Sequence, residues 1–503
     1  MLPRMWNHNP RFTHRLIGAL LACSLLAVGS RVAEAGTSIG SPFSDHMVIQ
    51  AELPVRVWGG DTAGTEVIVT FAGHEAITTA DADGYWEVEL PAVSEVGPYE
   101  LVVAGSDTIT LTDVVAGDVW LCSGQSNMAW PVKNSDSARW AVREKANPNI
   151  RFLTMPNNSV DAPADEVDVS WELAGPDTVK DFSAVGHFFG RRLHMETGRP
   201  IGLIDASWGG SKIRAWVPED SLRGHRLHEV LAQRSDEQVA DFERRLADYR
   251  ANGQKGQRPR PNGGGPQHKL SHLYNGMIHP LGNLPIRGVL WYQGESDAWM
   301  PDDYATLFDM LVAAWRDQFG DDELPVYFVQ LPNFDNGNED TWRRFREMQR
   351  LYVARPDDGI DMVVTIDVGD SKDIHPRKKK KVGERLAFLA LRDVYGQDIQ
   401  AGSPLPVSAT VESDGAVRVT FENVGDGLKV RGNKDILAFV LVDDTGKGHI
   451  ATAEIAGPDT VLVRAEGVEA PTIVRYAYRP DPKVNLVNAA DEPVTPFSIE
   501  LGE

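Results

Sequence analysis

Cysteine is nearly absent from this chain, since only Cys23 and Cys122 occur among its 503 residues. If the amino-terminal segment is removed after export, Cys122 stands alone, so no disulfide can form within the chain. Two cysteines by themselves also do not build a structural zinc site. The fold must therefore be stabilised by its hydrophobic cores.

Positive charge is also scarce: 50 Lys and Arg residues face 72 Asp and Glu residues, giving a formal net charge of -22. Phosphate binding needs a basic face, and the field of such a chain repels polyanions, so the composition argues against a nucleic-acid partner. The hydrophobic content of 42% and the charged content of 24% are those of an ordinary globular protein. The length favours roughly two to four domains.

The first 35 residues have the plan of a secretory signal peptide. Three arginines precede an apolar stretch at residues 16–28, and Ala33-Glu34-Ala35 fits a small-x-small cleavage site. The apolar stretch is shorter than the roughly 20 residues of a membrane span, so we expect no stable span. We predict cleavage near Ala35 and a secreted or periplasmic protein, with a lipoprotein attached through Cys23 as the alternative.

Both ends of the mature chain are predicted to be β domains. Residues 36–117 contain alternating runs such as 66–71 (EVIVTF) and 85–90 (YWEVEL), separated by turn signals. Short strands at such spacing are typical of a sandwich. The same alternation returns in residues 399–503, so we predict a β-sandwich-like domain on each side of the centre.

The central residues 118–398 are predicted to form an α/β domain. Short apolar runs, at residues 119–122, 201–206, 288–292 and 325–331, alternate with amphipathic helical stretches. Such alternation favours a parallel sheet covered by helices on both faces. Residues 222–270 interrupt it with a charged helical segment and a loop rich in Gly and Pro, and we interpret them as inserts.

Two polar residues follow predicted strands in positions that suit nucleophilic catalysis. Ser126 comes directly after residues 119–122, with Gly124 to permit a tight turn and a helix expected next, which is how α/β hydrolases expose a serine. His375 lies in a turn held by Pro376, where one ring nitrogen can face a serine while the other meets an orienting acceptor. Each residue alone fits a helix-capping role equally well.

Two further motifs could stabilise an oxyanion. Gln293 and Gly294 follow residues 288–292, and a side-chain amide there can donate a hydrogen bond to developing negative charge. Gly209 and Gly210 follow another predicted strand and expose backbone N–H groups. All four motifs fall at the carboxyl ends of parallel strands, the edge at which open α/β sheets bind ligands.

The order of these motifs resembles that of the sialate O-acetylesterase family, which belongs to the SGNH hydrolases. The motifs are GQSNM at 124–128, WGGS at 208–211, WYQGES at 291–296 and DIHP at 373–376. The resemblance covers nearly the whole mature chain. It implies a flavodoxin-like SGNH hydrolase core with a parallel sheet, flanked by N-terminal and C-terminal β domains, and it implies no cofactor and no metal.

Carried over by position, the resemblance implies roles for individual residues. Ser126 would be the nucleophile and His375 the general base. The oxyanion hole would combine the Ser126 N–H, an N–H of Gly209 or Gly210, and the Gln293 side chain. Substrate-binding or supporting roles are expected for Asn127, Glu295 and Arg346. The basic run at residues 377–381 is interpreted as a solvated helix face.

The acid that orients His375 departs from the wider SGNH pattern. That pattern places an acid three residues before the histidine, and Lys372 stands there in this chain. Asp373 is the nearest candidate and Asp370 the next. Either the Asp373 carboxylate or its main-chain carbonyl could orient the ring, and a Ser–His dyad is the remaining alternative.

Together these features predict a serine esterase that removes acetyl groups from sugar hydroxyls through an acyl-enzyme, with an acetylated carbohydrate as its partner. An acetylxylan or other polysaccharide acetylesterase is the alternative within enzymes. A non-catalytic glycan-binding protein is the alternative of another class, and the presence of Ser126, His375 and Gln293 argues against it.

Overall fold

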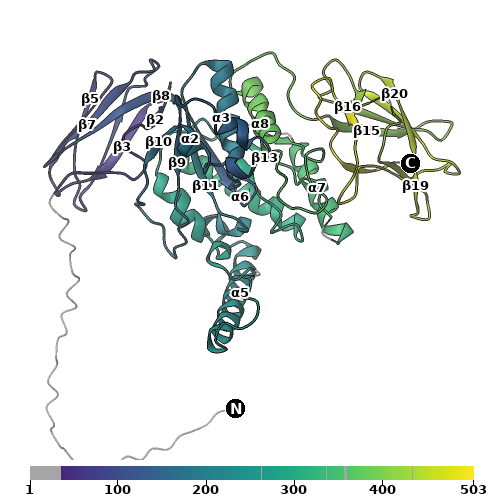
Figure 1. The fold of residues 1–503 in the computed structure, drawn as a ribbon, viewed down its shortest axis with the longest axis horizontal. Coiled ribbons are helices and arrows are strands. Elements are labelled where there is room, and N and C mark those ends of the chain that lie inside the picture. The colour runs from purple at the N-terminus through teal and green to yellow at the C-terminus, as the bar shows by residue number, and fades with distance from the viewer. Residues whose placement is uncertain (1–35, 262, 336, 356–358, 433, 503) are drawn as a thin grey trace, which may run out of the picture.

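The computed structural model describes residues 36–261, 263–335, 337–355, 359–432 and 434–502. The predicted signal peptide, with Cys23, lies outside these residues. Figure 1 shows three parts in a row: an N-terminal β region, a central α/β region and a C-terminal β region. Cys122 is free and buried in the central region.

Two antiparallel sheets make up the N-terminal β region. One contains β1 (Ser38–Ile39), β3 (Val55–Gly60) and β6 (Tyr85–Leu90). The other contains β4 (Glu66–Phe71), β5 (His74–Thr79), β7 (Tyr99–Ala104) and the start of β8 (Thr108–Gly124). Strands β4 and β6 have the bounds that the alternation predicts, because every second side chain of each is buried.

Strand β8 joins this region to the central sheet without a break. Its first part pairs with β7 and with β2 (Val48–Gln50), and its last part pairs in parallel with β11 (Ile201–Ser207) and β12 (Gly288–Tyr292). All residues from Val114 to Gly124 are buried. The predicted boundary between residues 117 and 118 therefore falls inside one continuous strand.

The central sheet has the strand order β10-β9-β11-β8-β12-β13-β14. Its remaining strands are β9 (Asn147–Thr154), β10 (Trp171–Ala174), β13 (Val326–Val329) and β14 (Ile360–Val363). All neighbours are parallel except the edge pair β10 and β9. From β11 to β14 the five strands follow the chain order 2-1-3-4-5, a doubly wound arrangement.

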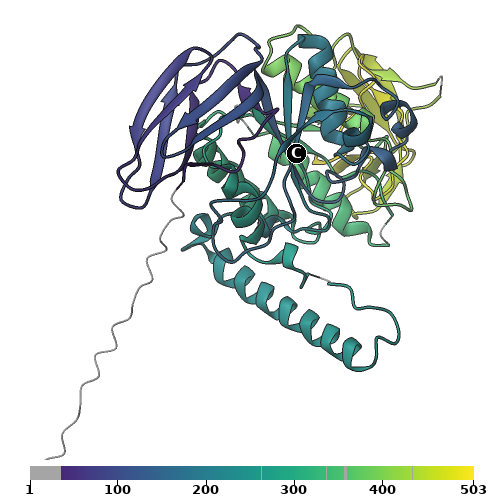
Figure 2. The same ribbon diagram turned by 60° about the vertical axis from the view of Figure 1, so that its left-hand side comes forward.

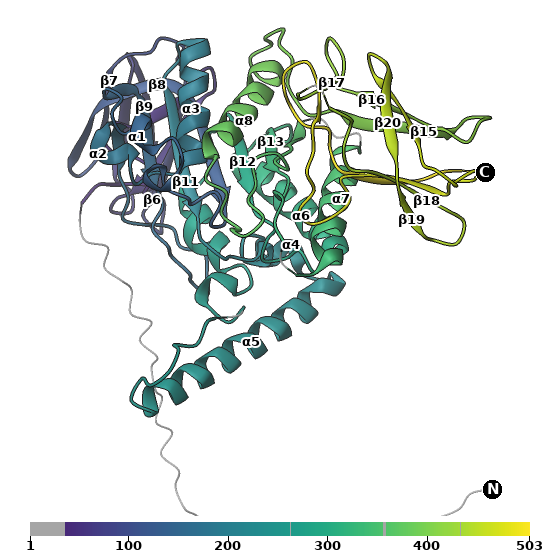
Figure 3. The ribbon, with the colours of Figure 1, turned by 45° about the vertical axis from the view of Figure 1, so that its right-hand side comes forward.

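Helices cover both faces of this sheet, which confirms the predicted α/β class (Figure 3). Helices α3 (Ala184–Thr197) and α8 (Lys379–Asp393) pack in one core with Trp120 and Leu203. Helices α6 (Pro301–Phe319) and α7 (Glu339–Val353) pack in the other core with Leu121. Neighbouring residues of β8 thus face opposite helical layers, because side chains alternate along a strand.

The shorter helices lie in connections. They are α1 (Ala138–Ala141), α2 (Pro176–Val179) and α4 (Glu219–Leu222), together with short 3-10 and π segments. Within the predicted insert, α5 (Arg226–Ala251) projects from the body, and the chain after it runs back beside it (Figures 1 and 2). The buried residues of α5 are Leu227, Leu231 and Ser235, all in its first half, so only its base is packed.

The C-terminal β region contains two four-stranded sheets and one strand pair. The first sheet has β15 (Leu405–Val411), β16 (Val417–Glu422), β21 (Thr460–Arg464) and β20 (Thr452–Gly457). The second has β19 (Gly448–Ile450), β18 (Phe439–Val442), β22 (Ile473–Tyr476) and β24 (Phe497–Glu500), and β17 (Lys429–Val430) pairs with β23 (Leu486–Val487).

The two four-stranded sheets share a core, in which the rings of Phe421 and Phe497 lie 6.0 Å apart. The predicted boundary at residues 398 and 399 falls between α8 and β15. Within the described ranges, no helix combines the length and the apolar character needed to cross a membrane.

Candidate active site

Ser126 lies just past the carboxyl end of β8, on a turn that requires glycine. Gly124 has φ +134°, and a Cβ atom there would lie 2.2 Å from the carbonyl oxygen of Tyr292. The N–H of Gln125 donates to that same carbonyl at 2.9 Å. This close approach ends the strand and leaves Ser126 partly exposed.

The helix that we expected after Ser126 is absent. The N–H groups of Met128 and Ala129 both donate to the Gln125 carbonyl, which closes one turn, and the chain then becomes extended at Pro131. Proline has no N–H to continue a helical ladder, so the turn stops there. The expectation of a helix directly after Ser126 was therefore wrong, because Pro131 follows the serine too closely for a helix to form.

His375 approaches Ser126 from the loop between β14 and α8. Its Nε2 atom lies 2.9 Å from Ser126 Oγ, a hydrogen-bond distance. The ring of Trp130 stacks on the imidazole, with centroids 5.0 Å apart and planes 15° from parallel. The two residues that the motifs single out therefore meet across 249 positions of sequence, with the ring held in place.

Burial is the main influence on His375 and lowers the pKa of its imidazole from the usual value of 6.5. The charge of Asp373 raises this pKa, and the charge of Lys379 lowers it further. A lowered pKa keeps the imidazole neutral at neutral pH, and the neutral form is the one that can accept the serine proton.

Asp373 is close to His375 without making a hydrogen bond to its ring. Its Oδ1 accepts the backbone N–H of His375 at 2.9 Å and lies 3.6 Å from Nδ1. Asp370 accepts the backbone N–H groups of Lys372 and Asp373 and so shapes the loop. Among the described carboxylates, Asp373 is the one within ion-pair distance of the ring, and its role in orienting His375 stays a prediction.

The backbone of the loop after β11 runs close to the serine. A Cβ atom on Gly209 would lie 3.5 Å from Ser126 Cβ, so this backbone passes directly beside the nucleophile. In the part of the chain that the structure describes, the N–H groups of Ser126, Gly209 and Gly210 donate to no other protein group. They are free to receive an oxyanion.

Gln293 is differently placed from what the motif suggested. Its Nε2 donates to the Ser211 carbonyl at 3.1 Å and to Asp297 Oδ2 at 2.7 Å. An amide nitrogen carries two hydrogens, so both are committed. This geometry argues against the predicted donation to an oxyanion. Gln293, which is 1% exposed, instead supports the loop that carries Gly209.

Asn127 and Glu295 take part in a hydrogen-bond network next to the serine turn. The Asn127 Nδ2 donates to Glu295 Oε1 and to the carbonyl of Ile374 at 3.0 Å, and its Oδ1 accepts from Lys379 Nζ. Asn127 and Lys379 are both 0% exposed. These contacts favour the supporting role for Asn127, because the network ties the serine turn to the histidine loop. Glu295 is partly exposed, and its role in substrate binding stays a prediction.

Lys379 was expected on a solvated helix face, and the structure places it inside. Burial lowers the pKa of its ammonium to about 7, although the charges of Glu295 and Asp373 raise it. Burial likewise raises the pKa of the Glu295 carboxyl. The Lys379 ammonium also lies 5.0 Å from the centre of the Tyr292 ring. The basic run therefore has one inward member, whose partners lie far away in the sequence.

Arg346 is buried as well. It is 1% exposed in α7, and its guanidinium donates to the carbonyls of Arg479 and Pro480. Burial lowers its pKa to about 9. This burial argues against a substrate contact and favours the supporting role, in which Arg346 attaches the C-terminal β region to the central one.

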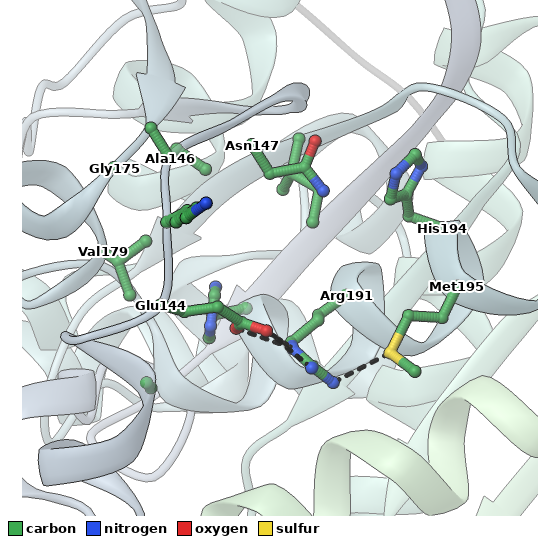
Figure 4. A pocket seen from close by; sticks show the side chains of 13 residues that line it. Glu144, Ala146, Asn147, Gly175, Val179, Arg191, His194 and Met195 are labelled. Atoms are coloured by element: carbon green, nitrogen blue, oxygen red, sulfur yellow. Dashed lines mark hydrogen bonds and ion pairs between the residues drawn. The ribbon is translucent and has the colours of Figure 1, made fainter.

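A cavity of about 270 Å³ lies apart from these residues (Figure 4). Glu144 and Arg191 form an ion pair in it, and His187 lines it with both ring nitrogens unpartnered among the described groups. Burial lowers the pKa of His187 to about 4, so the ring is neutral. No Ser, Thr or Cys is among the residues that line the cavity, so it offers no hydroxyl or thiol nucleophile for an acyl-enzyme.

No metal site accompanies the serine. Over the described ranges, no three His, Cys, Asp or Glu side chains are grouped so as to hold a metal ion. The described site thus offers a serine, a histidine and free backbone N–H groups, which can attack a carbonyl and hold the oxyanion.

Comparisons with known proteins match this chemistry. A family model described as a carbohydrate esterase, sialic acid-specific acetylesterase, matches residues 116–247 and 259–392. The sialate O-acetylesterase of Mus musculus is 31% identical over 444 residues, covering 79% of this chain and 81% of that protein. The sialate O-acetylesterase of Homo sapiens is 32% identical over 426 residues, covering 77% of this chain and 76% of that protein.

A solved structure agrees along nearly the whole chain. A carbohydrate acetylesterase from Xanthomonas citri is 32% identical, with a TM-score of 0.81, and the match covers 92% of this chain and 99% of that one. The fold, the site and these matches define a carboxylic ester hydrolase. The chain belongs to the sialic acid-specific acetylesterase family of carbohydrate esterases, which confirms the resemblance drawn from its motifs.

Proposed function

We propose that this protein hydrolyses O-acetyl esters of sialic acid through an acyl-enzyme intermediate on Ser126. The observation that carries the proposal is the 2.9 Å contact between His375 Nε2 and Ser126 Oγ, beside N–H groups that have no other protein partner. The sialic acid part of the proposal draws on the names of the family and of the mammalian relatives.

The reaction would proceed in two stages. In the first, Ser126 Oγ attacks the acetyl carbonyl while His375 Nε2 accepts the serine proton, and the oxyanion receives hydrogen bonds from the N–H groups of Ser126, Gly209 and Gly210. His375 then donates the proton to the departing sugar oxygen. In the second, His375 takes a proton from a water molecule that attacks the acetyl-serine, and it then donates this proton to Ser126 Oγ as acetate leaves, which restores the free serine and the neutral base.

We also assign the core to the SGNH hydrolase type. The 2-1-3-4-5 order from β11 to β14 supports this, and Ser126, Gly209, Gln293 and His375 each follow a strand of that set. Export after cleavage near Ala35 is part of the same proposal and is supported by the composition of residues 1–35. Amino-terminal sequencing of the exported protein should then begin at Gly36.

Acetylated polysaccharides are the second candidate substrate, because the Xanthomonas citri neighbour is described more broadly as a carbohydrate acetylesterase. The test is acetate release from O-acetylated N-acetylneuraminate, acetylated xylan and 4-nitrophenyl acetate, measured side by side. A higher kcat/KM on the sialic acid ester supports the proposal. A higher kcat/KM on xylan transfers the function to polysaccharides, and no acetate from any substrate would favour a glycan-binding protein.

A further inference from the structure

Lys212 is a buried cation in the same loop as Gly209, whose backbone passes beside Ser126. It follows Gly209 by three residues, a distance that the chain spans in at most about 11 Å. The residue is 8% exposed, and its ammonium keeps some contact with solvent. Across the described ranges its ammonium has neither a hydrogen-bond acceptor nor a carboxylate within ion-pair distance, so it is a largely buried charge without a direct protein partner.

A second cation reaches the same place from another segment. The Lys212 ammonium lies 5.6 Å from the centre of the Trp299 ring, and the guanidinium carbon of Arg234 lies 4.5 Å from it. Trp299 is 46% exposed. Arg234 lies in the first half of α5 and also has no carboxylate partner in the described structure. The partly exposed Trp299 ring thus has two cations beside it that lack carboxylate partners in the described structure.

The surrounding charges do not neutralise this pair. Arg214 adds a third cation, whose guanidinium donates to the His268 carbonyl and to Gln238. Asp297 is the carboxylate whose negative charge acts on Lys212. It is 2% exposed, and its Oδ2 already accepts hydrogen bonds from the Ile213 N–H and from Gln293. Burial raises the pKa of Asp297 and lowers that of Lys212. A bound anionic ligand would stabilise the charges of both Lys212 and Arg234.

Such a cluster is unexpected in a chain whose formal net charge is -22. We propose that Lys212 and Arg234, gathered by Trp299, form a subsite for the carboxylate of an acidic sugar while its acetyl ester lies at Ser126. Ammonium and guanidinium groups bind carboxylates through charge-assisted hydrogen bonds. The base of α5 thereby acquires a function: it supplies one of the two cations that distinguish acidic from neutral sugar esters.

This inference rests on the proposed function for the position of the ester, and binding can be measured without catalysis. Calorimetry on the Ser126→Ala protein compares N-acetylneuraminate with its carboxamide, which lacks the charge. We expect the carboxylate to bind at least about tenfold more tightly, because hydrogen bonds between charged groups are stronger than those of a neutral amide. Equal binding of the two ligands would overturn the subsite even if the esterase activity is confirmed.

Variants locate the effect. Lys212→Met and Arg234→Met keep the unbranched stems that pack against neighbours while removing the charge. Each should reduce the binding ratio of carboxylate to carboxamide by about tenfold, and the kcat/KM ratio on the two acetylated ligands should fall in parallel. Arg250→Met, at the exposed far end of α5, is the matched control and should leave both ratios unchanged.

The outcomes separate the two proposals. If Arg234→Met and Lys212→Met retain the wild-type binding ratio, the cation cluster does not read the carboxylate and the inference is wrong. If the ratio falls as expected but no acetate is released from any ester by the wild-type protein, the subsite stands and the catalytic proposal fails. Because Arg234 is partly exposed on a helix surface, its variant provides a result even if Lys212→Met does not fold.

Discussion

Replacing Asp373 by Asn tests how much the loop carboxylate contributes to catalysis. Asn keeps an oxygen that can accept the His375 N–H at 2.9 Å, so the loop should retain its shape while the charge is lost. The carboxylate lies 3.6 Å from Nδ1, and the two side chains are 44% and 29% exposed. At an effective dielectric constant between those of water and a protein surface, two such charges attract each other by roughly 1–4 kcal/mol. Because both side chains are partly exposed, the interaction energy lies at the low end of this range.

We therefore expect Asp373→Asn to lower kcat/KM by about 5- to 30-fold, the equivalent of about 1–2 kcal/mol, which is less than the roughly 10⁴-fold loss for the acid of a hydrogen-bonded triad. Because the Asp373 charge raises the pKa of His375, its removal should also move the acidic limb of the pH–rate profile to lower pH. Steady-state kinetics from pH 4 to 9 would measure both effects.

Asp370→Asn is the matched control for this prediction. Asp370 shapes the same loop through the N–H groups of Lys372 and Asp373, and Asn can accept both bonds. We expect its kcat/KM to stay within about threefold of wild type, since exposed substitutions that keep their contacts cost little. A 10⁴-fold loss of kcat/KM in Asp373→Asn would refute the modest electrostatic role given to Asp373. A larger loss in Asp370→Asn than in Asp373→Asn would refute the choice of Asp373 as the carboxylate that acts on His375.

Two further substitutions test the groups that support the site. Lys379→Met removes the buried ammonium that lowers the pKa of His375, so the acidic limb should move to higher pH, opposite to Asp373→Asn; an unchanged limb would show that Lys379 has no electrostatic effect on the base. Gln293→Ala removes the two hydrogen bonds that Gln293 donates to Ser211 and Asp297. We therefore expect the free energy of unfolding to fall by about 1–3 kcal/mol, with a lower Tm, and kcat to fall roughly tenfold. A loss of 10²–10³-fold at unchanged Tm would instead restore Gln293 as a direct oxyanion donor.

The site edge could be predicted because its signals are local. Each motif follows an apolar run, and parallel strands bring their carboxyl ends to one edge, so Ser126, Gly209, Gln293 and His375 were placed together from sequence. The sheet, the helices on both faces and the charged helical insert follow from periodicity and charge in the same way, whereas the projection of α5 from the body appears only in the structure.

The direction in which each side chain points could not be predicted, because it depends on distant partners. The Lys379 partner Asn127 is 252 positions away, and the carbonyls that bind Arg346 are 133 and 134 positions away. From sequence alone, Lys379 in a basic run and Arg346 on an amphipathic helix are both predicted to be exposed, because their distant partners are not visible in the local pattern. The pKa of His375 is a similar case, since burial outweighs the neighbouring carboxylate that the sequence shows.

The central claim, that Ser126 is the nucleophile of an acetylesterase, is tested most directly by the kcat of Ser126→Ala on O-acetylated N-acetylneuraminate. The protein should fold as wild type, because Ser126 is partly exposed and its side chain has His375 as its hydrogen-bond partner. We predict that kcat falls by roughly 10⁴–10⁶-fold, the scale seen when a hydrolase loses its nucleophile. A folded Ser126→Ala protein that releases acetate at a rate near that of wild type would contradict the account.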